Sequence, residues 1–418
     1  MLIYDTRYRS MTIQVIALGL LGLALWWLGN NLNTNLEAKG KDISFAFLWT
    51  RAGYDIDQQL ITYTNDSSHG RALFVGLINT LVVAFVGCIF ATIIGVFAGV
   101  ARLSKNWVVA RLMTVYVEVF RNVPLLLWII LAFTVFSETM PNITDFKVTQ
   151  AMIDSGTPPA ASMILGDTVA ISNRGSNIPY PMLTRPLGGF EVLGIPVNLS
   201  FIAVIGLFVA SIMGSRAINR RAKAVQEATG VRPVTWWKNL AIIILPTTAL
   251  LLALGLHWDV PYFPTTETGA TKGFNFVGGV NLAHNFTALV IALALYTGCY
   301  IAESVRAGIM AVSRGQSEAA AALGLRQGRI MSLVVLPQAL RVIVPPLISQ
   351  YLNLTKNTTL GMTIGYLDLK GTLGGITMNQ TGRELECMLL MMMIYLIISL
   401  CISAVMNVYN ASTKLKER

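Results

Sequence analysis

Long runs of apolar residues, separated by polar segments, recur along most of the 418-residue chain. A helix needs about 20 mainly apolar residues to cross a hydrocarbon core of about 30 Å. We predict a membrane-spanning helix in each of the longest runs. These are Thr12 to Gly29, Ala72 to Val100, Pro124 to Phe136 with an extension to about Met140, Val197 to Met213, Leu240 to Leu256, Ala288 to Ile301 with extensions at both ends, Val342 to Leu354, and Leu385 to Val408.

Composition supports the same fold class. The chain is 54% hydrophobic and 12% charged, whereas soluble domains average about 25% charged residues, and its mean hydropathy is +0.61. We therefore predict an all-α membrane protein with about eight transmembrane helices. The first run, which follows Arg7 and Arg9, lacks a small-residue cleavage site after it and is expected to be retained as a helix.

The net charge is +10. The positions of the cations along the chain indicate the orientation of the protein in the membrane. With eight spans and an internal N-terminus, most Lys and Arg residues lie in segments on the internal side, which predicts cytoplasmic N- and C-termini. The densest clusters are RAINRRAK, Arg216 to Lys223, and the C-terminal KLKER. We interpret them as a topology signal held by anionic lipid rather than as a nucleic-acid site.

Motifs for metal binding, nucleotide binding and catalysis are missing from the sequence. The four cysteines and three histidines are scattered, without the spacing of a metal site or a disulfide framework. No phosphate-binding G-x-x-x-x-G-K-[ST] motif occurs, and no Ser/His/Asp set is evident. We expect no metal, no cofactor in this chain and no enzyme activity of the chain alone, so that energy must come from another subunit.

One basic, alanine-rich segment interrupts the apolar pattern, EAAAALGLRQGRIMSLVVLP. Ser313 and Gln316 form a weak capping box, the alanines favour helix, and Gly324 suits a left-handed helix end. We predict a helix of about 10 residues that stops at Gly324, a second helix after it, and a bend at Pro337. Helices this short are marginal alone, so the segment should dock against another surface.

The spacing within this segment resembles the EAA loop of permease subunits in binding-protein-dependent ABC importers. Val334 stands where that family usually has Ile. The resemblance implies a type I importer permease core, in which the loop forms a coupling helix in a groove of a cytoplasmic ATPase and alternating access follows ATP-driven closure. The ATPase-coupling residues would be Glu318, Ala319, Ala320, Gly324, Leu336 and Pro337.

Four further stretches are similar to the polar amino-acid branch of that family. They are GLINTLVV, YVEVFRNVPLL, YIAESVRAGI and NLTKNTTL, the last with Thr359 in place of Ser. Length and layout resemble the larger permease subunit of general L-amino-acid importers of the Aap or Bzt type. The expected divisions are 1–71, an extra helix and external segment; 72–140, the first part of the core; 141–284, an insertion with an external loop and two helices; and 285–418, the second part of the core.

The resemblance also implies an assembly in the bacterial inner membrane. Its partners would be a second permease subunit, different but related, two ATPase subunits that bind ATP and Mg, and a periplasmic amino-acid-binding protein. The Pro-, Gly- and Ser-rich segment 141–196 has the composition of irregular structure. Either a docking surface for an external partner or a plain surface loop is consistent with it.

Polar residues at the end of the Val342 to Leu354 run are candidates for the substrate path. Amide and hydroxyl groups suit the ammonium and carboxylate of an amino acid, and polar groups at membrane depth usually face an aqueous path. An alternative role for Lys356 is to place its ammonium at the membrane interface. If Asn357 faces the substrate, its neutral side chain would weaken selection for cationic substrates. The candidates are Asn353, Lys356, Asn357, Thr358 and Thr359.

Two Glu-x-x-Arg pairs lie near predicted cytoplasmic helix ends, Glu118 with Arg121 and Glu303 with Arg306. The simpler interpretation is ion pairing within each helix; the alternative is a gate or coupling contact. For the chain as a whole, the main rival function is an ion-coupled secondary amino-acid transporter, which should show carboxylates in the middle of its spans or broken helices in corresponding halves. A membrane-bound enzyme would need a catalytic cluster.

Overall fold

The structure is a computed structural model that describes residues 6–38, 40, 42–192, 195–231 and 233–413. The KLKER cluster, residues 414–418, lies outside the described residues. The longer helices are α1 (Thr6–Ala38), α2 (His69–Ala101), α3 (Trp107–Asn122), α4 (Leu125–Thr139), α6 (Leu199–Thr229), α7 (Trp236–Ala253), α8 (His284–Met310), α11 (Leu336–Asn357) and α13 (Glu384–Thr413).

Seven helices of the described chain are long and apolar enough to span a membrane, in the places that the apolar runs predict. The exception is the run that begins at Pro124. Its helix, α4, has only 15 residues and passes as a span only together with α3, to which it is bent by 106°. Val123 is extended, as a residue before proline tends to be, and this separates the two helices.

The centre of the bundle is the contact between α2 and α8. A Cβ atom on Gly95 would lie 2.6 Å from the Ile301 Cβ, and one on Gly99 would lie 2.7 Å from the Ala302 carbonyl oxygen. The Gly95–Gly99 spacing therefore lets the two backbones approach closely, as a G-x-x-x-G pattern does in membranes. Helices α3, α4 and α11 also pack against α8, and α13 packs against α11.

The segment that precedes α13 is part of the core. It forms a π-helical segment, η5 (Lys370–Thr377), and a short helix, α12 (Met378–Thr381). A Cβ on Gly76 of α2 would lie 2.1 Å from the Thr372 Oγ1, so η5 sits directly on α2. Because Gly371 and Gly375 lack side chains, this segment fits into a buried position.

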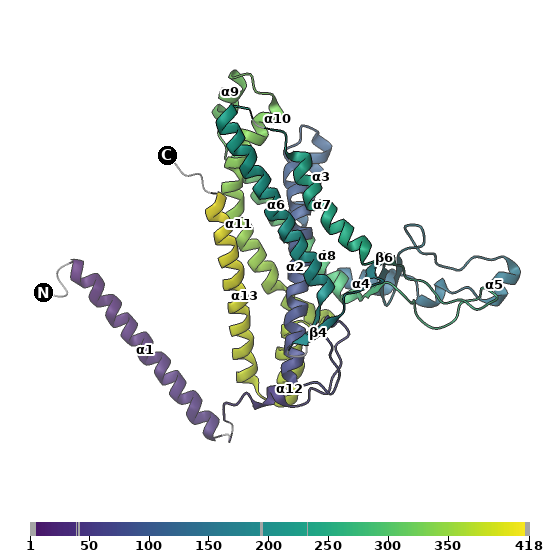
Figure 1. The fold of residues 1–418 in the computed structure, drawn as a ribbon. Coiled ribbons are helices and arrows are strands. Elements are labelled where there is room, and N and C mark those ends of the chain that lie inside the picture. Colours follow the sequence, from purple (N-terminus) through teal and green to yellow (C-terminus); the bar gives the residue numbers. More distant parts are fainter. Residues whose placement is uncertain (1–5, 39, 41, 193–194, 232, 414–418) are drawn as a thin grey trace.

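Helix α1 and the pair α6–α7 lie at the edge of the molecule. Figure 1 shows α1 standing apart from the other helices, and its apolar span is unburied. Helices α6 and α7 pack mainly on each other. Their outward surfaces are apolar, which suits contact with lipid or with another subunit.

A small lobe projects from the side of the bundle (Figure 1). It combines the segment before α6 with the segment after α7. Segment 141–196, expected to be irregular, therefore also contains short strands. The strands pair antiparallel as β1 (Ala170–Ser172) with β2 (Gly175–Ile178), β2 with β7 (Val280–Leu282), β3 (Tyr180–Leu183) with β6 (Leu256–Asp259), and β4 (Gly189–Val192) with β5 (Ile195–Asn198).

The remaining short elements connect these parts. They are η1 (Ala46–Trp49), η2 (Ile143–Phe146), α5 (Gln150–Ser155), α9 (Arg314–Ala322), α10 (Gln327–Ile330), the π-helical η3 (Met331–Val335) and η4 (Thr358–Ile364).

Candidate functional site

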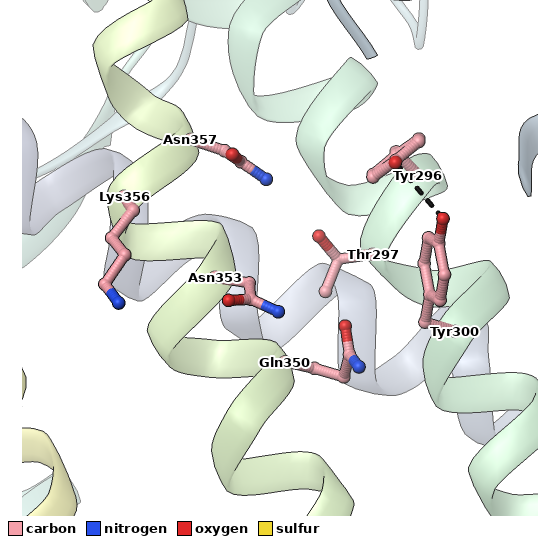
Figure 2. Close-up of a pocket in the computed structure, with 7 residues that line it drawn as sticks. All are labelled: Tyr296, Thr297, Tyr300, Gln350, Asn353, Lys356 and Asn357. Atoms are coloured by element: carbon pink, nitrogen blue, oxygen red, sulfur yellow. Dashed lines mark hydrogen bonds between the residues drawn. The ribbon is translucent and has the colours of Figure 1, made fainter. Parts of the chain in front are cut away.

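A polar pocket of about 370 Å³ lies between α8 and α11. Figure 2 shows the amides of Gln350, Asn353 and Asn357 pointing from α11 toward α8. They lie at spacings of three and four residues, on one face of the helix. The full lining is Tyr296, Thr297 and Tyr300 from α8, and Gln350, Asn353, Lys356 and Asn357 from α11.

The pocket offers donors and acceptors on both walls. The Tyr296 and Tyr300 hydroxyls lie 3.2 Å apart and share a hydrogen bond, whereas the amides on α11 have no hydrogen-bond partner among the described residues. Lys356 contributes to the lining, but its ammonium extends away from α8 (Figure 2). Amides and hydroxyls of this kind suit both charged ends of an amino acid.

Three of the five predicted path residues line this pocket, and two do not. Thr358 is fully buried and donates to the Thr355 carbonyl oxygen at 3.0 Å. Thr359 donates to the Lys356 carbonyl oxygen at 2.8 Å. Both lie in η4, where α11 tightens into a 3₁₀-helix, so their side chains leave the face that Asn353 and Asn357 share.

Four lining residues were not predicted from the sequence: Tyr296, Thr297, Tyr300 and Gln350. A signal for Gln350 exists, because it precedes Asn353 by three residues and Asn357 by seven. On α8, Tyr296 and Tyr300 are four residues apart and look like ordinary interfacial aromatics. Only the packing of α8 against α11 identifies them as lining residues.

Behind the pocket, Thr358 leads to a buried carboxylate. The Thr358 hydroxyl, which donates its proton to Thr355, lies 3.4 Å from Asp368 Oδ2, and this oxygen accepts from the Tyr395 hydroxyl at 3.3 Å. The other oxygen, Oδ1, accepts from the Gly371 amide at 2.8 Å. These neutral donors satisfy a carboxylate with 0% exposure, and they join η4, η5 and α13.

The predicted loop helix is present as α9, which has 9 residues and ends before Gly324. Gly324 has a φ of +76°, and nothing lies within 4 Å of a Cβ placed there. The Gly324 amide donates to the Ala321 carbonyl oxygen at 2.9 Å, and the Leu325 amide donates to that of Ala320 at 3.3 Å. This is a Schellman ending, so glycine is required for backbone conformation rather than for space.

Only one face of α9 is attached to the rest of the chain. Ala320 is buried and packs with Ile330 and Val335. Glu318 and Ala319 point outward, and Leu323 is 83% exposed. An outward surface of small and apolar side chains at the end of a short helix suits a groove in another protein.

Two details of the loop differ from the prediction. Ser313 begins α9, but its side chain makes no capping hydrogen bond. Gln316 instead accepts a hydrogen bond from the Gln338 side chain at 2.8 Å, so the expected capping box is wrong. Pro337 follows the π-helical turn η3 at the start of α11, and the chain stays helical through it. Leu336 and Pro337 therefore belong to α11 and are exposed.

The two Glu-x-x-Arg pairs behave differently. Glu303 Oε1 pairs with Arg306 at 2.5 Å, and Oε2 pairs with Arg102, the C-cap residue of α2. The Arg102 side chain is only 9% exposed. This cluster ties the end of α2 to α8, and its member Arg102 was not predicted.

The expected ion pair between Glu118 and Arg121 is absent among the described residues. Glu118 accepts a hydrogen bond from Asn122 at 3.5 Å, and the Arg121 guanidinium lies 5.6 Å from the centre of the Tyr300 ring. A cation–π contact of this kind places Arg121 beside a pocket residue. Sequence spacing alone does not distinguish it from the paired Glu303.

Comparisons with known proteins agree with the loop motif. The family model "Binding-protein-dependent transport system inner membrane component" matches residues 271–415. The Rhodobacter capsulatus "Glutamate/glutamine/aspartate/asparagine transport system permease protein BztB" is 60% identical over 100% of this chain and 96% of its own length. The Rhizobium johnstonii "General L-amino acid transport system permease protein AapQ" is 40% identical over 99% and 94%.

Among solved structures, the chain is similar to one titled "Crystal structure of an amino acid ABC transporter with histidines". The two share 18% sequence identity, with a TM-score of 0.43, over 82% of this chain and 95% of the other.

Proposed function

Since the chain belongs to the permease subunits of binding-protein-dependent amino-acid ABC importers, we propose that the pocket between α8 and α11 lies on its substrate path. The protein is a multi-pass inner-membrane subunit that works with a binding protein and with an ATPase, where ATP is hydrolysed. The loop around Gly324 would be the contact with that ATPase.

One observation carries the proposal: the loop and the pocket are joined by a single helix. Helix α11 begins at Leu336 next to the loop and ends at Asn357 in the pocket, over 22 residues or about 33 Å. On the other wall, α8 continues from Tyr296 to Met310, four residues before α9. A displacement of α9 by the ATPase would therefore move both walls of the pocket and open it to alternate sides.

The charge of the lining supports a substrate class. It contains no carboxylate, and its one cationic residue, Lys356, directs its ammonium away from α8, so the pocket should accept neutral and acidic amino acids better than cationic ones. The name of one relative includes glutamate, glutamine, aspartate and asparagine, and the name of the other includes L-amino acids in general. Both are compatible with a neutral, amide-rich lining.

We further propose that the second permease subunit is a different but related chain, that two ATPase subunits bind, and that both termini are cytoplasmic. The basic segment Arg216 to Lys223 supports this orientation, since it lies toward the end of the bundle that carries α9 (Figure 1).

The test uses the assembled transporter in proteoliposomes with ATP inside, measuring glutamine uptake in competition with glutamate, alanine and arginine. Loss of a hydrogen bond to a charged substrate group costs about 1.5–3 kcal/mol, so Asn357→Ala should raise KM at least tenfold. Thr359→Ala is the matched control, because Thr359 is two residues away but outside the pocket.

Equal KM values for the two variants would place the substrate path elsewhere. Uptake that ran on an ion gradient without ATP would instead support the rival secondary transporter.

A further inference from the structure

Helix α6 continues past its apolar part as a basic segment that the transport mechanism does not use. Its apolar run ends at Met213, and Arg216, Arg220 and Lys223 follow at spacings of four and three residues, on one face. An open groove of about 450 Å³ runs along this face. Its lining is Arg216, Asn219, Arg220, Lys223 and Gln226.

The cations of this groove are largely uncompensated. Among the described residues, neither Arg216 nor Arg220 has an acidic partner. Lys223 lies 3.7 Å from Glu227, with both side chains mostly exposed, and such surface pairs are weak. No carboxylate lines the groove, so it presents a concentrated positive charge.

Hydrogen bonds to α7 fix the depth of the groove. The Asn219 Oδ1 accepts from the Asn239 amide at 2.9 Å and from the Thr235 hydroxyl at 3.4 Å. Asn219 is therefore level with the first turn of α7, which carries Trp236 and Trp237, 70% and 53% exposed. Exposed tryptophans of membrane proteins concentrate at headgroup level.

The surface next to the groove is apolar on the membrane side. Met213 on α6 and Leu240 on α7 are 64% and 53% exposed. Met213 lies three residues before Arg216, and Leu240 follows Asn239, which bonds to Asn219; each lies toward the apolar part of its helix. A ligand in the groove would thus have cations around one end and an apolar surface beside the other.

We propose that this groove binds the phosphate of an anionic phospholipid, whose acyl chains lie along α6 and α7. Arg216 and Arg220 would hold the phosphate through their forked guanidinium groups, while Lys223 adds charge and Asn219 and Gln226 add amide donors. An acidic protein surface would meet the same cations, but the neighbouring tryptophans and apolar residues favour the bilayer.

The test is native mass spectrometry of the assembled transporter during titration with phosphatidylglycerol, with phosphatidylcholine as the neutral lipid. In the double variant Arg216→Gln/Arg220→Gln the phosphate would lose two forked, charge-assisted guanidinium contacts. This variant should therefore bind phosphatidylglycerol roughly ten- to thirtyfold more weakly. The control Lys105→Gln/Arg111→Gln removes two exposed cations elsewhere and should bind it like the unmodified protein.

Three results would overturn the proposal. The first is equal phosphatidylglycerol binding by both double variants, with ATPase subunits retained as a check of folding. The second is displacement of the lipid by excess inorganic phosphate, which would assign the groove to a free anion. The third is loss of ATPase subunits from Arg216→Gln/Arg220→Gln with unchanged lipid binding, which would assign it to protein docking.

Discussion

The Gln338 side-chain amide donates a hydrogen bond to the side-chain oxygen of Gln316, Oε1, at 2.8 Å. The bond joins the first turn of α11 to the first turn of α9, 22 residues earlier in the chain. It is a direct polar link between the loop helix and the helix that reaches the pocket. A force applied to α9 is therefore passed to α11 through this contact as well as through the apolar packing around Ala320.

Breaking this link should weaken coupling more than assembly. Gln338→Ala removes a hydrogen bond worth about 1 kcal/mol, so we expect about a fivefold fall in substrate moved per ATP hydrolysed, with the ATPase still bound. Gln327→Ala, an exposed glutamine in the same loop, should leave the ratio unchanged. The ratio is measured in proteoliposomes; an equal effect of both variants would contradict the role of the link.

Two glycines of the loop allow the effect of backbone conformation to be distinguished from the effect of side-chain size. A β-branched residue at Gly324 must adopt a φ of +76°, which costs about 1–2 kcal/mol or more. Gly315 lies in α9 with ordinary φ and free space. We expect Gly324→Val to reduce uptake and ATPase binding severalfold and Gly315→Val to preserve both, measured by uptake and co-purification. Normal uptake by Gly324→Val would exclude the coupling role.

The two Glu-x-x-Arg motifs allow the stability contribution of the paired Glu303 to be compared with that of Glu118, which forms no ion pair among the described residues. Glu303→Gln leaves the nearly buried Arg102 without its carboxylate, and hydrogen bonds to charged groups contribute about 1.5–3 kcal/mol. We expect a lower Tm for this variant in detergent. Glu118→Gln removes only the weak contact with Asn122 and should leave Tm nearly unchanged. If Glu118→Gln were the more destabilising, the assignment of the two motifs would be reversed.

The buried Asp368 predicts a pH dependence of stability. Burial raises the pKa of its carboxyl to about 6 from 3.8, although the Gly371 amide and the Tyr395 hydroxyl oppose the shift. Between about pH 4 and pH 6 the folded protein thus binds more protons at this site than the unfolded chain does. The free energy of unfolding should fall as pH rises through this window, and the loss should be complete above about pH 6.

The measurement is Tm of the detergent-solubilised transporter from pH 4.5 to 7. Asp368→Asn should remove the contribution of this site to the pH dependence, whereas Asp167→Asn, an exposed aspartate of the lobe, should retain it. A pH profile identical in all three proteins would show that Asp368 has the same proton affinity in the folded and unfolded states.

Local signals explain which parts of the fold were predictable. The apolar runs identify most of the spans because a bilayer demands length and apolarity, and alanine propensity with Gly324 identifies α9. Of the strands of the lobe, β3, β6 and β7 were missed because their partners are distant in sequence, as with Ile178 and Val280. The buried η5 was missed because its position depends on close approach to Gly76 of α2.

The residues of the candidate site also fall into those that local sequence identifies and those that depend on tertiary packing. Asn353 and Asn357 are identified by polarity on an apolar helix, but Thr358 looks equivalent until the change to a 3₁₀-helix turns it away. Tyr296 enters the pocket only through the packing of α8 on α11. Likewise, the distinction between Glu303 and Glu118 depends on Arg102, about 200 residues earlier than Glu303.

The loose attachment of α1 and of the α6–α7 pair has an evolutionary consequence. These three helices share little buried surface with the central helices, so their gain or loss need not disturb the α8–α11 frame. The peripheral helices can therefore change in sequence, and adapt to a different lipid composition or partner subunit, while the packing of α8 on α11 is kept.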